Sequence, residues 1–171
     1  MGNPYVVAGA GDAWRAEAAA SGRRGTQRLL EVRTLAPGDE VRAALALGEG
    51  ELAVLRSRLM LLEDVPVEIA ESFYPASFAV GTPLSASGKI RGGAVAVLAS
   101  LGRAAAEVAE AITACLPTPS EMDILAIDRG EPLLLQTRIS YDKSGEPVEY
   151  SVNRMVARRS RPVEYRLKVM P

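Results

Sequence analysis

The segment ELAVLRSRLMLLEDVPVEIAESFY, residues 51–74, decides the fold because it is expected to form a β-hairpin. Two apolar runs containing β-branched residues flank an acidic turn that ends in a proline, and this order is typical of antiparallel strands joined by a short connection. A four-residue turn places Arg58 opposite Glu71, whereas a two-residue turn places Arg56 opposite Glu71. Both registers predict an arginine–glutamate pair across the two strands.

A second hairpin of similar design is expected nearer the C-terminus. The runs PLLLQTRISY, residues 132–141, and EPVEYSVNRMV, residues 146–156, flank an Asp-Lys-Ser-Gly turn. Aspartate at the start of the turn and glycine at its end suit a type I turn followed by a left-handed residue. With four residues in the turn, Arg138 lies opposite Glu149.

The tripeptide Pro-Val-Glu occurs three times, at residues 66–68, 147–149 and 162–164. In the first two copies the proline stands near the start of a returning strand, where a missing backbone N–H is tolerated. By the same reasoning the third copy opens a last strand.

Arg56 and Arg58 lie two residues apart, so both side chains emerge from one face of the expected strand. Two guanidinium groups on one face suit an anion in a cleft. The alternative is that arginines and glutamates in these strands form rim salt bridges, each worth at most about 1 kcal/mol. The residues alone leave both interpretations open.

Four helices and one further strand are expected outside the hairpins. Asp12 is placed to cap a helix that stops at Gly22. A strand over 26–37 and a short helix over 38–48 follow. Glycines begin and end another apolar helix, and the last helix carries a capping box with a proline at its first position; these two helices occupy residues 92–102 and 118–127.

Residues 104–115 are ambiguous between a helix and a strand. The run is rich in alanine and glutamate but also contains Val108, Ile112 and Thr113, and a proline follows it. Its intrinsic propensity slightly favours a helix.

The composition is that of an ordinary soluble domain. A chain of 171 residues and 18.1 kDa is long enough for one sizeable core, so a single domain over residues 12–171 is expected, preceded by a linker or flexible N-terminus at 1–11. Twenty basic and 21 acidic residues give a net charge of −1, which does not favour nucleic acid as a partner. We expect no membrane span and no signal peptide, and therefore a cytoplasmic protein.

The absence of histidine restricts the chemistry that the chain can perform. The sequence contains no histidine and one cysteine, Cys115. This excludes histidine-dependent catalytic triads and most zinc sites, and Cys115, in an alanine-rich context, is interpreted as a small buried hydrophobe. We expect no metal and no cofactor.

Five motifs in order resemble the UTRA effector-binding domain of GntR-type transcriptional regulators of the HutC-like branch. They are R-S-R, P-V-x-x-x-E-S-F-Y-P, I-R-G-G-A-V-A-V-L, P-T-P-S-E-x-x-x-L and R-I-S-Y-D-x-x-G-E-P-V-E, and the similarity covers about residues 27–156. The resemblance implies an α+β fold of the chorismate-lyase type, in which helices pack on a mostly antiparallel sheet. It implies a strand over 104–115, a ligand cleft between sheet and helices, and a homodimer.

The resemblance also implies a set of ligand-binding residues. The R-x-R strand corresponds to the part of the family that contacts an anionic group of the effector. The glycine pair opens a helix whose backbone N–H groups and positive dipole end suit a phosphate or carboxylate, and the second hairpin lines the other side of the cleft. The candidates are therefore Arg56, Arg58, Glu71, Ser72, Gly92, Gly93, Arg138, Tyr141 and Glu149.

Three departures from the family pattern bear on the ligand. Ala70 stands where an acidic residue is frequent, Gly93 and Val95 stand where serine and tyrosine are frequent, and Arg159-Ser160-Arg161 replaces an Asp-Arg-Tyr segment. These departures argue against a sugar phosphate and favour a less polar anionic metabolite.

Two functions follow from the residues and the resemblance. The first is the effector-sensing part of a regulator, which does not bind DNA by itself because no winged helix is found before residue 12. The alternative is a free-standing enzyme acting on an anionic small molecule, with arginines stabilising the substrate and Glu71 or Glu149 as acid or base. The lack of an activated nucleophile, metal cluster or cofactor loop favours the first.

Overall fold

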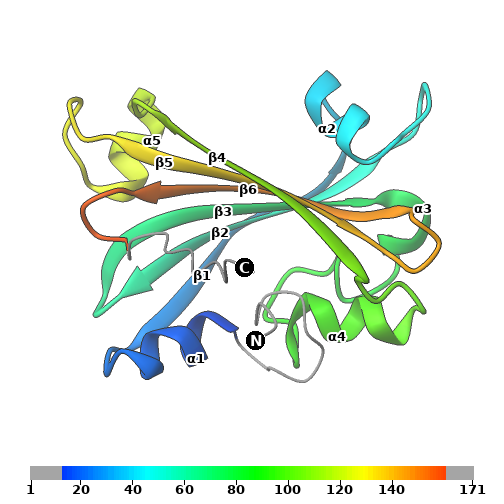
Figure 1. Ribbon diagram of the computed structural model, residues 1–171, viewed down its shortest axis with the longest axis horizontal. Helices are drawn as coiled ribbons and strands as arrows, with labels where there is room; N and C mark the ends of the chain where they lie inside the picture. The colour runs from blue at the N-terminus through cyan, green and yellow to red at the C-terminus, as the bar shows by residue number, and fades with distance from the viewer. Residues whose placement is uncertain (1–12, 161–171) are drawn as a thin grey trace, which may run out of the picture.

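The computed structural model describes residues 13–160, which form one six-stranded antiparallel sheet with helices on both faces (Figure 1). The strand order is β1-β2-β3-β6-β5-β4. This is the α+β architecture expected from the sequence. The linker expected at residues 1–11 and the strand expected at 162–164 lie outside the described residues.

Both predicted hairpins and the expected helices are present. The strands are β1 Gly25–Leu35, β2 Ala53–Leu62, β3 Val65–Pro75, β4 Glu107–Cys115, β5 Leu133–Tyr141 and β6 Pro147–Val156. The helices are α1 Ala13–Ala20, α2 Asp39–Ala44, α3 Ala76–Ala79, α4 Gly93–Ser100 and α5 Pro119–Leu125. Thr118 and Glu121 form the predicted capping box. The four-residue helix α3, just after Pro75, was not predicted.

The chain folds as two copies of one unit, α1-β1-α2-β2-β3 and α4-β4-α5-β5-β6. Equivalent elements begin 80 residues apart in the pairs α1/α4, α2/α5 and β2/β5, and 82 apart in the pairs β1/β4 and β3/β6. The spacing extends to backbone detail, because Ala46 and Ala126 both have φ 51° just after a short helix. The sheet order is therefore symmetric about the central β3–β6 pair, and β1 and β4 form its two edges.

Each face of the sheet packs against helices from both copies. On one face, α1 and α4 pack against side chains that include Met60, Val54 and Tyr74; we call this the α1–α4 face. On the opposite α2–α5 face, the helices pack against residues such as Ala53 and Leu59. Figure 1 shows α1 and α4 below the sheet and α2 and α5 above it. The core is thus divided between two layers.

The register of the first hairpin differs from both predicted registers. Leu62 pairs with Val65 across a two-residue turn, but the pairing shifts after Leu61, and Val67 is the extra residue of a β-bulge. Beyond this bulge, Glu71 lies opposite Ser57 and not opposite Arg56 or Arg58. The predicted Arg–Glu pair is wrong because side chains alternate between faces, so one inserted residue moves Glu71 to the face opposite the arginines.

The second hairpin contains a bulge at the equivalent place. Tyr141 pairs with Pro147 and Ser140 with Glu149, which leaves Val148 as the extra residue. Arg138 consequently lies opposite Ser151, and the predicted pair with Glu149 is wrong. The turn itself is as predicted, since the Gly145 N–H donates to the Asp142 carbonyl at 3.0 Å and Gly145 has φ 83°.

The segment 107–115 is a strand, as the family resemblance implied, and the slight local preference for a helix is wrong. All nine residues of β4 pair with β5. Helix propensities differ by less than about 1 kcal/mol per residue, so the cross-strand hydrogen bonds of a complete ladder outweigh them.

The left-handed conformation of Ala126, with φ 51°, provides a test of backbone strain. A non-glycine residue in the left-handed region is strained by roughly 1–2 kcal/mol. Glycine relieves this strain, but its greater conformational entropy in the unfolded state cancels part of the gain in stability. We therefore expect Ala126→Gly to stabilise the domain by about 0.5–1 kcal/mol, measured as the midpoint of urea unfolding. Ala43→Gly, inside α2, is the control and is expected to destabilise it by about 1 kcal/mol. A loss of stability in Ala126→Gly would contradict this assignment of strain.

Candidate functional site

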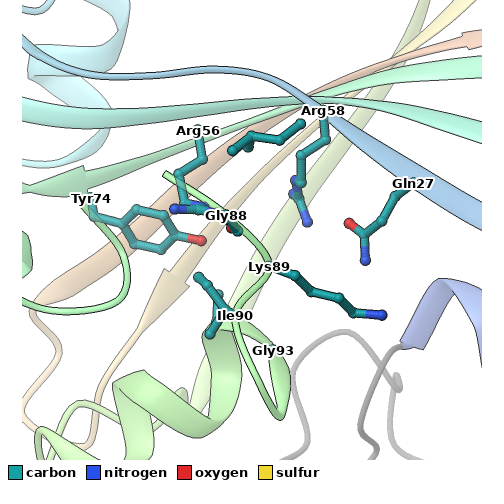
Figure 2. Close-up of a pocket in the computed structure, with 10 residues that line it drawn as sticks. Gln27, Arg56, Arg58, Tyr74, Gly88, Lys89, Ile90 and Gly93 are labelled. Atoms are coloured by element: carbon teal, nitrogen blue, oxygen red, sulfur yellow. Dashed lines mark hydrogen bonds between the residues drawn. The ribbon is translucent and has the colours of Figure 1, made fainter. Parts of the chain in front are cut away.

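A cavity of about 170 Å³ lies on the α1–α4 face between the sheet and the start of α4 (Figure 2). The strands contribute side chains from β1, β2 and β3, and the chain that leads into α4 closes the opposite side. The lining residues are Gln27, Leu29, Arg56, Arg58, Tyr74, Gly88, Lys89, Ile90, Gly93 and Ala94. None of these described lining residues carries a carboxylate, whereas three carry a positive charge.

Arg58 points into the space between the sheet and Lys89 in Figure 2. Its Nη2 donates to the Ser72 hydroxyl at 3.0 Å, while its Nε is buried without a hydrogen-bond partner among the described residues. An unsatisfied buried donor costs about 1–3 kcal/mol. Arg58, which lines the cavity, is therefore held by the sheet with part of its hydrogen-bonding capacity unused among the described residues.

Arg56 is arranged differently, although it also lines the cavity. Its side chain is buried, and its two terminal nitrogens donate to four backbone carbonyls in the segment that leads into α4, those of Pro83, Leu84, Ala86 and Gly88. Burial lowers the pKa of this guanidinium, but arginine stays protonated at neutral pH. Its charge is thus directed at the protein backbone.

The start of α4 forms the floor of the cavity. Gly92 is the N-cap with φ 78°, and a Cβ there would lie 3.2 Å from the Cβ of Ala96. Gly93 also has positive φ, and its N–H donates to the Ile90 carbonyl at 3.1 Å. The backbone N–H groups and dipole at this helix start add to the positive field of Arg58 and Lys89. The charged side chains among the described lining residues are all positive.

Tyr74 closes one end of the cavity and connects it to β6. Its hydroxyl donates to Glu149 Oε1 at 2.8 Å, and its ring is almost fully buried. Burial, helped by the charge of Glu149, raises the pKa of the tyrosine. Tyr74 therefore remains a neutral hydrogen-bonding group, with Glu149 behind it and not in the cavity wall.

The structure distributes the predicted site residues over both faces of the sheet. Arg56, Arg58 and Gly93 line the cavity, and Gly92, Ser72 and Glu149 adjoin residues that do. Arg138 shares the α1–α4 face but bonds to Glu110 on β4, with its Nε 2.6 Å from Oε1.

Two predicted residues lie on the α2–α5 face. The carboxylate of Glu71 accepts from Arg154 Nη1 at 2.7 Å, and Arg154 Nε contacts Glu121 of α5 at 2.8 Å. Tyr141, at the end of β5, lies on the same face because side chains alternate along the strand. Neither residue lines the cavity that contains Arg58.

The candidates derived from the sequence lack seven of the lining residues, namely Gln27, Leu29, Tyr74, Gly88, Lys89, Ile90 and Ala94. Tyr74 was detectable, because it follows Ser72 by two positions and shares its face. Gln27 and Leu29 come from β1, whose position over the arginines depends on strand pairing.

Residues 13–160 contain no group of three or more Asp, Glu, Cys or His side chains placed to hold a metal ion. No helix in this part of the chain is long and apolar enough to cross a membrane.

Comparison with known proteins identifies related domains. The sequence model of the UTRA domain family matches residues 20–167. No curated protein matches the chain. Among solved structures, the effector domain of PhnF from Mycobacterium smegmatis is similar with a TM-score of 0.76 at 22% identity, over 85% of this chain and 89% of that one. A second PhnF structure from the same organism has a longer chain. It is similar with a TM-score of 0.77 at 22% identity, over 85% of this chain but only 64% of that one.

Two further solved domains are similar at 25% identity. One is the ligand-binding domain of a protein assigned to the GntR family of transcriptional regulators from Bordetella bronchiseptica, with a TM-score of 0.73 over 86% of this chain and 90% of that one. The other is the C-terminal domain of the histidine utilization repressor from Pseudomonas syringae pv. tomato, with a TM-score of 0.70 over 85% of this chain and 100% of that one.

The carboxyl group of Glu68 generates a pH prediction. Glu68 lies on β3 between Met60 and Met155 of the neighbouring strands, and burial raises its pKa from about 4.5 to about 7, with Glu17 adding to the rise and Arg58 and Arg138 opposing it. Because the folded-state pKa exceeds the unfolded one, stability is fully present below pH 4.5 and is lost as pH rises through 7.

Glu68→Gln should remove this loss. We expect the variant to match the wild type near pH 4.5 and to be more stable than the wild type at pH 8, as measured by urea unfolding. Glu49→Gln, at an exposed position, is the control and should leave the pH dependence unchanged. Equal stabilities of Glu68→Gln and wild type at pH 8 would show that Glu68 ionises normally.

Proposed function

The chain belongs to the UTRA domain family, and we propose that its cavity binds a small anionic metabolite that acts as the effector of a GntR-type transcriptional regulator. Its fold is that of GntR-family effector domains, and it resembles their ligand-binding domains. The proposal is carried by one observation: the described lining residues include three cations and no carboxylate, and Arg58 among them has a buried donor with no hydrogen-bond partner in residues 13–160.

The dimensions and lining of the cavity narrow the class of effector. A cavity of about 150 Å³ in another protein holds benzene, so one of about 170 Å³ suits a ligand built on a single ring or a short chain. Leu29, Ile90 and Ala94 supply apolar contacts, while Arg58 and Lys89 supply charge. These features support a small organic anion with an apolar body.

In the intact regulator, the effector would act by binding two conformations with different affinity. Only such a difference lets an effector change DNA affinity at another domain. We propose that residues 12–171 form the effector-binding domain of a cytoplasmic regulator and that this domain senses the effector without contacting DNA. The family match, which lies within these residues, supports this assignment.

The enzymatic alternative is not favoured. The described lining contains no carboxylate or cysteine, and the chain has no histidine. Tyr74 is the one lining tyrosine, and its pKa is raised, which opposes a role as a general base at neutral pH. Similar solved structures include domains of a GntR-family transcriptional regulator and of a repressor.

We further propose a homodimer that uses the α2–α5 face. Two open grooves lie on this face at positions related by the internal repeat, one beside α5 and one beside α2. The first includes the exposed side chain of Leu30. A pair of equivalent grooves suits a two-fold interface, in which each copy presents the same surface to the other.

The role of Arg58 can be tested by a thermal-shift screen with small anions such as benzoate, phenylacetate and phenyl phosphate. A ligand that binds only the folded state raises the melting temperature. We expect a saturable rise with at least one of them, and Arg58→Met should weaken that binding by about 10–100-fold, because hydrogen bonds to a charged group contribute roughly 1.5–3 kcal/mol. Arg28→Met is the matched control, since Arg28 is exposed and faces away from the cavity on β1. Undiminished binding by Arg58→Met would refute its role.

The oligomeric state can be tested by light scattering coupled to size-exclusion chromatography. We expect a mass of about twice 18.1 kDa at micromolar concentration. Leu30→Glu should shift the protein toward the monomer, because it places a charge at the proposed interface. Val80→Glu, which alters an exposed apolar residue elsewhere, should leave the dimer intact. A monomeric wild type, or a dimeric Leu30→Glu, would contradict the proposed interface.

A further inference from the structure

Arg56 and Arg58 are close in sequence but point at different targets. Figure 2 shows the Arg58 guanidinium directed into the cavity, while that of Arg56 is turned toward the segment that carries Gly88. Arg56 Nη1 donates to the carbonyls of Ala86 at 2.7 Å, Leu84 at 3.0 Å and Pro83 at 3.2 Å, and Nη2 donates to Gly88 at 2.7 Å. Only 5% of the residue is exposed.

These contacts organise the segment between α3 and α4. Residues 80–92 contain no helix or strand, so regular backbone hydrogen bonding does not fix their course. Leu84 anchors the segment in the core, where it is fully buried, and Arg56 binds the carbonyls around and after it. Lys89 and Ile90, which line the cavity, directly follow the last carbonyl bound by Arg56.

We propose, on the premise of the proposed function, that Arg56 is a positioning residue that holds the 83–88 loop as the cavity wall. Arg58 is then the one arginine directed at the ligand's head group, and the cavity selects a small carboxylate over a phosphate monoester. The R-x-R pattern suggests that both arginines bind the anion, whereas here Arg58 binds it and Arg56 positions the loop.

The selection follows from the number of charges that each head group presents. A carboxylate carries one charge and two oxygens, which one guanidinium can bind in a bidentate manner. A phosphate monoester carries between 1.5 and 2 negative charges near neutral pH and three acceptor oxygens. Lys89 also lines the cavity, but a lysine presents a single point charge and not a planar fork of donors. To add a second guanidinium to the site, Arg56 would have to leave its four carbonyls, and buried carbonyls without donors cost free energy. A second guanidinium contact to a dianion therefore comes at the expense of the loop.

The first experiment measures the loop in the ligand-free protein by amide hydrogen exchange. We expect Arg56→Met to accelerate exchange of the amides of residues 84–88 at least tenfold relative to those of β2 and β3, and Arg58→Met to leave the loop at wild-type rates. Arg56→Lys keeps a cation with three donors and should give an intermediate rate, and it serves as the second variant if Arg56→Met does not fold. Wild-type exchange of the loop in the Arg56 variants would overturn the positioning role.

The second experiment compares benzoate with phenyl phosphate, which share a ring and differ in the head group. By calorimetry at pH 7.5 we expect the wild type to bind benzoate at least tenfold more tightly, and we expect this preference to shrink in Arg56→Lys, where the loop and the cation are less firmly held. A merely structural arginine would change stability without changing the ratio of the two affinities. Tighter binding of phenyl phosphate by the wild type would overturn the selection.

The two experiments separate failure of this inference from failure of the proposed function. The exchange experiment needs no ligand, so it decides the role of Arg56 even if neither compound binds. Faster loop exchange without binding of either compound would support the positioning role and contradict the selection of a small carboxylate. Binding of benzoate with an unchanged loop would support an anion site and overturn the role of Arg56.

Discussion

The alternation of side chains along the strands, shifted by one residue in each hairpin, governs which groups meet in this domain. Val67 and Val148 are the extra residues of equivalent bulges. Without the bulge in the first hairpin, Glu71 would share a face with Arg56 and Arg58 and would neutralise the charge of the cavity. With it, Glu71 pairs with Arg154 on the other face, and the arginines remain available for other partners.

The internal repeat shows how the described residues of the second half differ from those that line the cavity in the first half. Arg138 occupies the position in β5 that Arg58 occupies in β2, 80 residues earlier. The residue opposite Arg58 on the edge strand is Leu29, whereas Glu110 lies opposite Arg138 and accepts from its Nε at 2.6 Å. Arg56 is replaced by Gln136 at the equivalent position. The second copy has thus neutralised or removed both cations, and its arginine stabilises the sheet edge.

The cavity has one wall made of paired strands and another made of the irregular segment 80–92, and this combination suits a ligand sensor. Strand pairing fixes Arg58 and Tyr74, while residues 80–92 lie outside any helix or strand and depend for their course on local turn hydrogen bonds and side-chain contacts. Segments held by few contacts open at lower free-energy cost than core strands. The wall that follows α3 is therefore the part of the site best able to change between conformations, and it leads directly into α4, so a movement there would reach a helix that packs on the sheet.

The sequence by itself determined the local elements. Short-range rules of turns and caps predict the hairpins at Glu63-Asp64 and at Asp142–Gly145, the capping box at Thr118 and the glycine pair before α4. The family motifs identified the sheet and the strand β4.

Tertiary structure decided the rest. A bulge adds one residue with no strong local signature, so the facing partners of Arg56 and Arg138 were not predictable from turn length. The carbonyls that bind Arg56 lie about 30 residues away along the chain, and Gln27 and Leu29 reach the cavity only through strand pairing. Sequence spacing fixes which side of a strand a residue occupies up to the next irregularity, whereas the partner it meets there depends on how distant segments pack.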